Sequence, residues 1–162
     1  MSASKHTLIA LVEDKPGVLA RVASLFRRRG FNIESIAVGH TERPGLSRVT
    51  LVVGGNSAEL EQVRKQLDKL INVVRVSDIS QQDIVARELA LIKVSATTST
   101  RSEIIQIVDI FRANIVDVAP DSLTVEVTGD EDKVESLISL LRSFGIKEIN
   151  RTGRIALTRG VT

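Results

Sequence analysis

The sequence predicts an α+β fold made of two tandem copies of one small unit, each with the element order βαββαβ. Strand-like and helix-like patterns alternate in that order over residues 7–76, and the same order recurs over residues 89–157. The second predicted helix of each half also carries apolar residues at matching positions, each pair 74 residues apart (134 − 60 = 74). An internal match of this kind is typical of a repeated supersecondary unit. The matching sets are Leu60, Val63, Leu67 and Leu70, then Val134, Leu137, Leu141 and Phe144.

The first half opens with an apolar run over residues 7–12, which predicts a buried strand. Apolar residues at spacings of three and four then predict a helix that begins near Val18. Three arginines close this helix, and Gly30 follows at a position where glycine commonly ends helices. Next come a strand at 31–38, a loop at 39–47, a strand at 49–53, a helix whose Asn56 and Glu59 resemble a capping box, and a strand at 73–76.

The polar residues 80–83 indicate a boundary between the halves. We therefore predict two domains, residues 1–80 and 81–162, with a linker at about 80–87. The second half offers a strand at 89–94, a helix whose Thr100 and Glu103 again resemble a capping box, strands at 114–118 and 123–127, a helix over 134–144, and a last strand within 146–157. A four-stranded antiparallel sheet with helices on one face leaves its other face and its edges to be covered. We therefore expect a dimer at least.

Composition limits the function. The chain has 162 residues and a formal net charge of +2, so bulk charge favours neither nucleic acid nor a membrane as partner. It has no cysteine and only two histidines, His6 and His40, which makes a zinc site an improbable interpretation. No nucleophile–base arrangement or paired carboxylates stand out, so we do not expect catalysis by this chain alone. The N-terminal apolar stretch is too short for a signal peptide or membrane span, and we expect a cytoplasmic protein.

The junction EDKPG, at residues 13–17, is the most informative stretch, because it joins a buried strand directly to a helix. The first N–H groups of a helix have no acceptor within it, and with the helix dipole they attract an anion such as a carboxylate. Pro16 fits the first helical turn, and Gly17 lets a ligand approach the backbone. Asp14 adds a carboxylate suited to an ammonium group, so the junction matches a free amino acid.

A purely structural interpretation of this junction stays open. Asp14 could cap the helix, and Pro16-Gly17 could be ordinary turn chemistry. The equivalent stretch of the second half, residues 94–100, has neither an acid nor Pro-Gly. The fold alone therefore does not demand this motif, which favours a binding role in the first half.

Several stretches resemble the small regulatory subunit of acetolactate synthase (acetohydroxyacid synthase). They include EDKPGVLARVASLFRRRGFNIES, LSRVTLVV, RELALIKV, FRANIVDV, DSLTVEVTGD and the terminal ALTRG, so the resemblance spans nearly the whole chain. The DKPG element alone marks ACT domains in general, whereas its combination with GFNIES and RELALIKV is more specific.

The resemblance implies an N-terminal ACT domain and an ACT-like C-terminal domain, both ferredoxin-like. It implies a regulatory subunit in branched-chain amino acid biosynthesis that binds and activates the large catalytic subunit and confers feedback inhibition by valine, or by leucine or isoleucine. Thiamine diphosphate, Mg²⁺ and FAD are expected on that catalytic partner and no cofactor on this chain. The effector is expected at the interface of two N-terminal domains.

The same resemblance implies which residues bind the effector. Asn32 would contact it from the partner chain, and an amide suits this role because it both donates and accepts. Enterobacterial small subunits have asparagine where this chain has Asp14, which leaves the preference among the three amino acids open. The full predicted set is Asp14, Lys15, Pro16, Gly17, Val18, Leu19, Asn32 and Ile33.

Three other functions compete with this interpretation. An ACT regulator of transcription would need a DNA-binding element, and two copies of the unit leave no room for one. An ACT regulator of another enzyme would have the same amino-acid-sensing domain as an acetolactate synthase small subunit. A stand-alone enzyme is opposed by the missing catalytic constellation.

Overall fold

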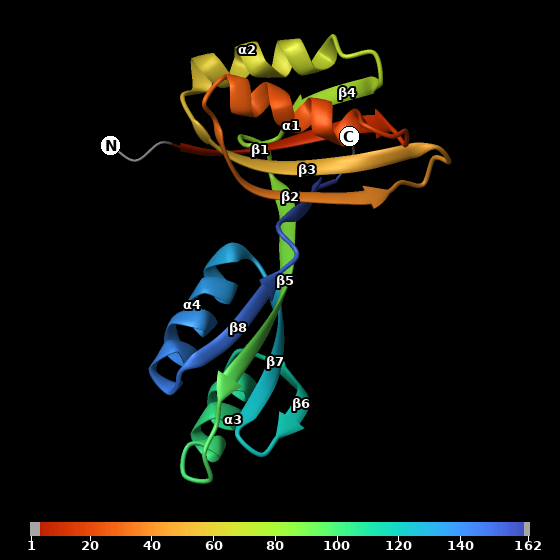
Figure 1. The fold of residues 1–162 in the computed structure, drawn as a ribbon. Coiled ribbons are helices and arrows are strands. Elements are labelled where there is room, and N and C mark those ends of the chain that lie inside the picture. The colour runs from red at the N-terminus through yellow and green to blue at the C-terminus, as the bar shows by residue number, and fades with distance from the viewer. Residues whose placement is uncertain (1–3, 161–162) are drawn as a thin grey trace. The chain divides into compact units, whose positions relative to one another are not determined.

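The computed structural model describes residues 4–160, which form two compact units (Figure 1). Unit 1 runs to Val85 and also includes the described residues from Arg154 onward, whereas unit 2 comprises Ala86–Gly153. The compact units thus divide the chain differently from the predicted ranges 1–80 and 81–162, because the last segment packs with the first unit.

Unit 1 has the predicted order βαββαβ. Its sheet has the strand order β2-β3-β1-β4, every neighbouring pair is antiparallel, and both helices lie on the same face (Figure 1). The elements are β1 (Ser4–Glu13), α1 (Val18–Arg28), β2 (Asn32–His40), β3 (Leu46–Gly55), α2 (Ser57–Asp68) and β4 (Val73–Asp78). The predicted ferredoxin-like architecture is confirmed.

The core of unit 1 lies between this sheet and the two helices. Leu8, Ala10 and Val12 alternate along β1 and are buried against the helices, as period-two patterning predicts. The helices contribute the apolar stripes read from the sequence, with Val22 and Phe26 on α1 completely buried. The ring of Phe26 meets that of Phe31 edge to face, with centroids 6.3 Å apart.

Residues 154–158 cover part of the opposite face of the same sheet. Strand β9 (Ile155–Thr158) pairs with β5 (Ile84–Ser95), and Arg48 Nη2 donates to Ala156 O at 2.8 Å. Arg154 Nη1 donates to Thr7 Oγ1 at 3.0 Å. The range 146–157 contains the predicted last strand of the second unit, at Ile146–Arg151, but the strand at Ile155–Thr158 was not predicted. Gly153, with φ at 82°, lies between these two strands.

Unit 2 repeats the architecture with the strand order β6-β7-β5-β8. A second aliphatic core lies between its sheet and its helices. Besides β5, the elements are α3 (Arg101–Ile110), β6 (Asn114–Ala119), β7 (Ser122–Gly129), α4 (Glu131–Leu141), a 3₁₀ turn (Arg142–Phe144) and β8 (Ile146–Arg151).

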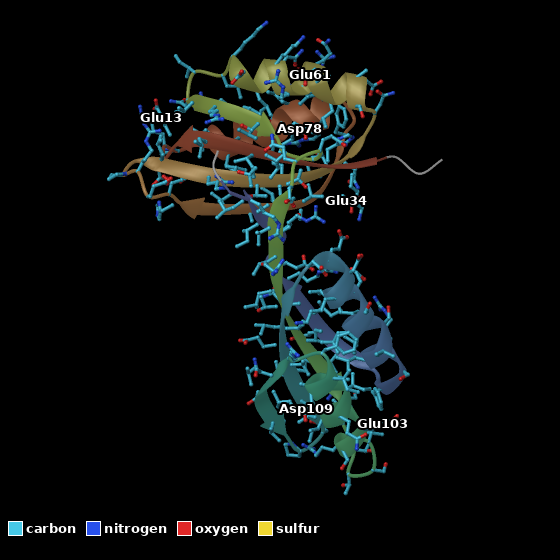
Figure 2. All side chains as sticks on the ribbon, turned by 180° about the vertical axis from the view of Figure 1, so that it is seen from behind. Glu13, Glu34, Glu61, Asp78, Glu103 and Asp109 are labelled. Carbon is cyan, nitrogen blue, oxygen red and sulfur yellow. The ribbon has the colours of Figure 1, made fainter. Side chains whose placement is uncertain are left out.

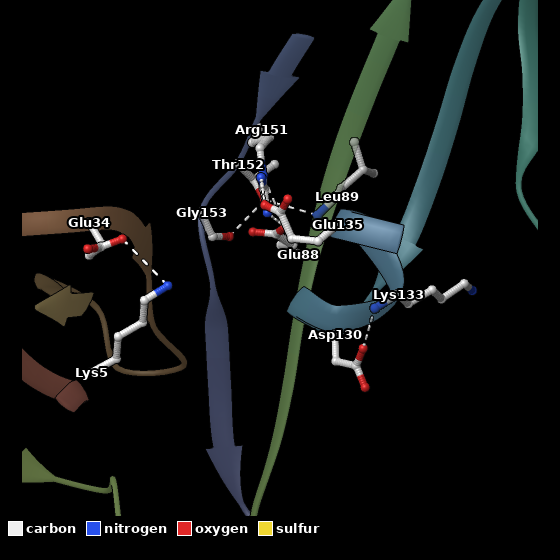
Figure 3. Close-up of polar contacts among 10 residues, drawn as sticks. All are labelled: Lys5, Glu34, Glu88, Leu89, Asp130, Lys133, Glu135, Arg151, Thr152 and Gly153. Carbon is white, nitrogen blue, oxygen red and sulfur yellow. Dashed lines mark hydrogen bonds and ion pairs between the residues drawn. The ribbon is translucent and has the colours of Figure 1, made fainter. Parts of the chain in front are cut away.

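A cluster of charged side chains links β8 to β5 and to α4 in unit 2 through hydrogen bonds (Figure 3). The guanidinium of Arg151 bonds to the carboxylates of Glu88 and Glu135, and its Nε lies 3.1 Å from Glu88 Oε1. The Glu88 side chain is only 9% exposed, against 49% for Glu135. Burial lowers the pKa of Arg151, but the hydrogen bonds that its guanidinium donates to the two carboxylates outweigh this effect and raise the pKa, so the cation is retained.

The helix caps agree with the sequence only in part. Asn56 caps α2 as expected, because its Oδ1 accepts from Ala58 N at 2.8 Å. Thr100 holds the N-cap position of α3 as predicted, but the expected capping box does not form: its side chain makes no cap bond to α3, and its Oγ1 accepts from Thr97 N at 2.9 Å instead. Asp130, which the sequence pattern did not indicate as a cap, caps α4 by accepting from Lys133 N at 2.9 Å (Figure 3). Across residues 4–160, every helix is too short or too polar to span a bilayer.

Candidate functional site

The junction between β1 and α1 is a tight turn closed by backbone bonds. Lys15 N donates to Glu13 O at 2.9 Å, and Asp14 N donates to Gly45 O in the β2–β3 loop at 2.9 Å. Helix α1 begins at Val18 with Gly17 as its N-cap, at φ 83° and ψ −9°. This left-handed conformation favours glycine, which explains the residue type at this position.

The junction corrects two expectations. Asp14 is not the N-cap of α1, because Gly17 holds that position and no side chain makes a cap bond there. Pro16 precedes the N-cap instead of lying in the first helical turn. The alternative that explained Asp14 by helix capping is therefore removed.

The first turn of α1 presents unused backbone donors. Within the described chain, the N–H groups of Gly17, Leu19 and Ala20 have no acceptor, while Val18 N donates to Lys15 O at 3.4 Å. A Cβ built on Gly17 would meet nothing within 4 Å, so the space before these donors is open. With no acidic residue in the first turn, the positive end of the helix dipole is left without a compensating charge from the helix itself. The arrangement can accept a carboxylate.

The two acidic side chains at the junction have different partners. The exposed Asp14 carboxylate lies 3.5 Å from His40 Nδ1, at the end of β2. Lys15 instead bonds to Glu13, with Nζ 2.9 Å from Oε2, which leaves Asp14 as the acid available to an ammonium group. That bond, with a second from Asn72, holds the pKa of Glu13 below its usual range (Glu13 is labelled in Figure 2). Sequence reasoning missed His40, Glu13 and Asn72 as neighbours, because only the strand register brings them together.

Asn32 and Ile33 lie far from this junction within one chain. Asn32 pairs with Gly54 on β3, which pairs with Lys5 at the start of β1. Asp14 follows the other end of β1, nine residues beyond Lys5, so the two groups of predicted site residues are separated by about 30 Å of strand. The Asn32 side chain is exposed, whereas Ile33 packs partly against the core. A site containing both groups therefore needs residues from two chains.

The metal-ligating side chains and the histidines give weaker candidates for a functional site. No group of three or more metal-ligating side chains occurs among residues 4–160. His6 is buried, with Nε2 3.3 Å from Gly55 O, and His40 belongs to the junction already described.

Two tandem ferredoxin-like units, one of them with an open, glycine-capped helix entrance, place the chain in the class of ACT-type regulatory proteins. Comparison with known proteins agrees. A model of the "AHAS small subunit-like ACT domain" matches residues 8–75, and a model of the "small subunit of acetolactate synthase" matches residues 87–160. The chain belongs to the acetolactate synthase small-subunit family, whose members are regulatory, non-catalytic subunits of that enzyme.

Individual relatives cover the whole length. The chain is 60% identical over 156 residues to a probable acetolactate synthase small subunit of Archaeoglobus fulgidus, covering 96% of this chain and 98% of that protein. It is 56% identical over 160 residues to the acetolactate synthase small subunit of Mycobacterium bovis, covering 99% and 95%. The crystal structure of the small subunit from Thermotoga maritima superposes with a TM-score of 0.89 at 45% identity, covering 98% and 99%. The resemblance read from the sequence is confirmed.

Proposed function

We propose that this chain senses a branched-chain amino acid for an acetolactate synthase: it binds and activates the large catalytic subunit and confers feedback inhibition by valine, or by leucine or isoleucine. The observation that carries the proposal is the entrance of α1, where three backbone donors without acceptors stand beside the Asp14 carboxylate. The names of the relatives, which are all small subunits of one enzyme, support the large subunit as partner.

The entrance suits the two charged ends of an amino acid. The carboxylate would accept hydrogen bonds from the N–H groups of Gly17 and Leu19, and the ammonium would face Asp14. Two or three hydrogen bonds to charged groups contribute ~1.5–3 kcal/mol each, and burial of a small aliphatic side chain contributes a similar amount. Since ordering and association cancel much of this, we expect a net ~4–8 kcal/mol, a micromolar to millimolar affinity. Cellular amino-acid pools would then set the occupancy.

The partner chain would complete the site through the edge strand β2. This strand ends the sheet and exposes Ile36 and Val38 by 37% and 51%. If two copies of β2 pair antiparallel about Ile36, Asn32 of one copy falls opposite His40 of the other, and His40 contacts Asp14. The same pairing would cover the exposed edge. The predicted residues Asp14 to Leu19 of one chain and Asn32 and Ile33 of the other would then share one ligand.

A ligand shared by two chains stabilises one placement of those chains. Its differential affinity for that placement is the coupling free energy that reaches the catalytic subunit, typically ~1–3 kcal/mol. The chain itself needs no cofactor for this role. Thiamine diphosphate, Mg²⁺ and FAD are proposed to reside on the catalytic partner.

The test is a reconstituted assay with the cognate large subunit, with and without valine. The variant Gly17→Asp places a carboxylate before the donors and should abolish inhibition while activation persists. Gly160→Asp is the matched control, because Gly160 also has a positive φ (72°) and open space, but belongs to neither group of proposed site residues. Full valine sensitivity of Gly17→Asp would contradict the proposed site, and equal loss in Gly160→Asp would assign the effect to backbone strain.

A further inference from the structure

The sheet face of unit 1 that α1 and α2 leave uncovered contains a cavity of about 690 Å³. Its walls come from β1, β3 and β4, from Glu42 in the β2–β3 loop, from residues 79, 82 and 83, and from residues 158 and 159, all within unit 1. This volume lies in the range of small-molecule sites. This cavity is not part of the proposed effector site at the entrance of α1.

One row of paired residues across the sheet gives the cavity wall its positive charge. Leu11 on β1 pairs with Arg48 on β3 and with Arg75 on β4, so the three side chains stand side by side on one face. Two strand spacings put the Cα atoms of the two arginines about 10 Å apart, within reach of one ligand for side chains of this length. In the next row Ile9 pairs with Ser77. Ile9 and Ile79 are only 5% and 4% exposed and form an apolar floor.

Within residues 4–160, the two arginines of this row form no ion pair with a carboxylate. Arg48 is half-buried and donates to Ala156 O, and burial lowers the pKa of its guanidinium. The nearby Glu42 attracts Arg48 but forms no ion pair with it in the described chain. Within residues 4–160, the side chain of Arg75 makes neither a hydrogen bond nor an ion pair. By contrast Arg159, on the cavity wall, has Nε 3.1 Å from Asp83 Oδ1.

Unit 2 shows that the fold does not require two arginines here. Both first strands of the units change register at the same point, after Leu11 in β1 and after Lys93 in β5. Lys93 pairs with Thr124 and with Glu148, the positions equivalent to the two arginines. Lys93 Nζ lies 3.9 Å from Glu148 Oε2, so this row balances its own charge. The unbalanced row of unit 1 is therefore a property of its side chains.

We propose that the cavity binds a small aliphatic carboxylate, with its charged end between Arg48 and Arg75. Guanidinium groups bind carboxylates through paired, charge-assisted hydrogen bonds. The hydrocarbon part of the ligand would rest on Leu11 and the isoleucine floor, which a purely inorganic anion would leave unused. Unit 1 would then hold two ligand sites, one at the entrance of α1 and one on the uncovered sheet face.

The experiment titrates the full chain calorimetrically with 3-methylbutanoate and with its uncharged amide at constant ionic strength. We expect one carboxylate per chain, at least tenfold weaker binding of the amide, and shifts of the methyl NMR signals of Ile9, Leu11 and Ile79. Arg75→Gln should weaken binding at least tenfold without harming the fold, since the Arg75 side chain has no polar partner within the described residues. Arg28→Gln, an exposed arginine in the last turn of α1, removes the same charge elsewhere and should leave binding unchanged.

The outcomes separate this site from the proposed effector site. Equal binding of the amide, or unchanged binding by Arg75→Gln, would overturn the proposal. Inorganic phosphate binding as tightly as 3-methylbutanoate would contradict the aliphatic part of the assignment. Gly17→Asp should retain 3-methylbutanoate binding, whereas displacement of 3-methylbutanoate by valine, or loss of binding in Gly17→Asp, would show that the ligand occupies the α1 entrance.

Discussion

Replacing Glu88 by glutamine should destabilise unit 2 through the Arg151 cluster. Glu88 is nearly buried and receives hydrogen bonds from Nε and Nη2 of Arg151, whereas Glu135 is half exposed and bonds to the same guanidinium. Glu135→Gln is therefore a matched control, with the same chemical change and the same partner but more solvent.

The expected loss of stability follows from the burial of the Glu88 side chain. A hydrogen bond to a charged group contributes ~1.5–3 kcal/mol, and removing one partner of a buried ion pair costs ~3–5 kcal/mol. Glutamine keeps one acceptor oxygen, and Arg151 keeps its bond to Glu135, so we expect a loss of about 2–3 kcal/mol for Glu88→Gln. An exposed ion pair is worth ~0–1 kcal/mol, which sets the expectation for Glu135→Gln.

Native-state hydrogen exchange on the full chain is the suitable assay, since it reports each unit separately. The protected amides of β5 and β8 in unit 2 should lose protection in Glu88→Gln, while those of β1 and β3 in unit 1 keep theirs. A loss in Glu88→Gln no larger than that in Glu135→Gln would refute the argument that burial decides the strength of this cluster.

Three further predictions concern single positions. Asp14→Asn should change the affinity for valine, leucine or isoleucine without loss of fold, and calorimetric titration that finds all three unchanged would remove Asp14 from the site. Gly55→Ala should cost about 1–3 kcal/mol, because its Cβ would collide with a buried phenylalanine ring, while Gly39→Ala meets open space and should be nearly neutral in thermal denaturation followed by circular dichroism. The hydrogen bond from Lys147 lowers the pKa of Asp121, so this pair stabilises the fold fully above the ordinary carboxyl pKa of 3.8 and loses its effect as the pH falls through the lowered value. Lys147→Gln should reduce this acid-side loss of stability, and an identical acid denaturation curve would contradict it.

Local patterns predicted most of the fold because its elements are locally encoded. Within residues 4–160, apolar spacing identified all four α-helices, and apolar runs and alternation identified every strand except β9. The failures arise from competing local hydrogen bonds and from contacts between distant residues. Thr100 is the N-cap residue of α3, but its hydroxyl accepts from Thr97 N, three residues earlier, instead of capping the helix. Residues 154–160 followed the second half in sequence, yet their hydrogen bonds reach Thr7 and Arg48 in the first unit.

The candidate site was predictable to the extent that it is local. The motif at residues 13–17 correctly indicated exposed helix-entry donors, since these depend only on the turn and on Gly17. The approach of His40 to Asp14 depends on how β2 and β3 are paired, which no local spacing reveals. The two-arginine row likewise becomes visible only once three strands are aligned.

The return of residues 154–158 to the first unit makes unit 2 an insertion within unit 1. During synthesis on the ribosome, Thr7 and Arg48 are made early, but they can form their hydrogen bonds to Arg154 and Ala156 only after residues 154–158 have been translated. A polypeptide shortened to end at residue 153 should therefore retain the helix-covered core of unit 1 while uncovering Thr7 and Ile9. Deletions near the carboxyl end should thus be felt first in the amino-terminal unit.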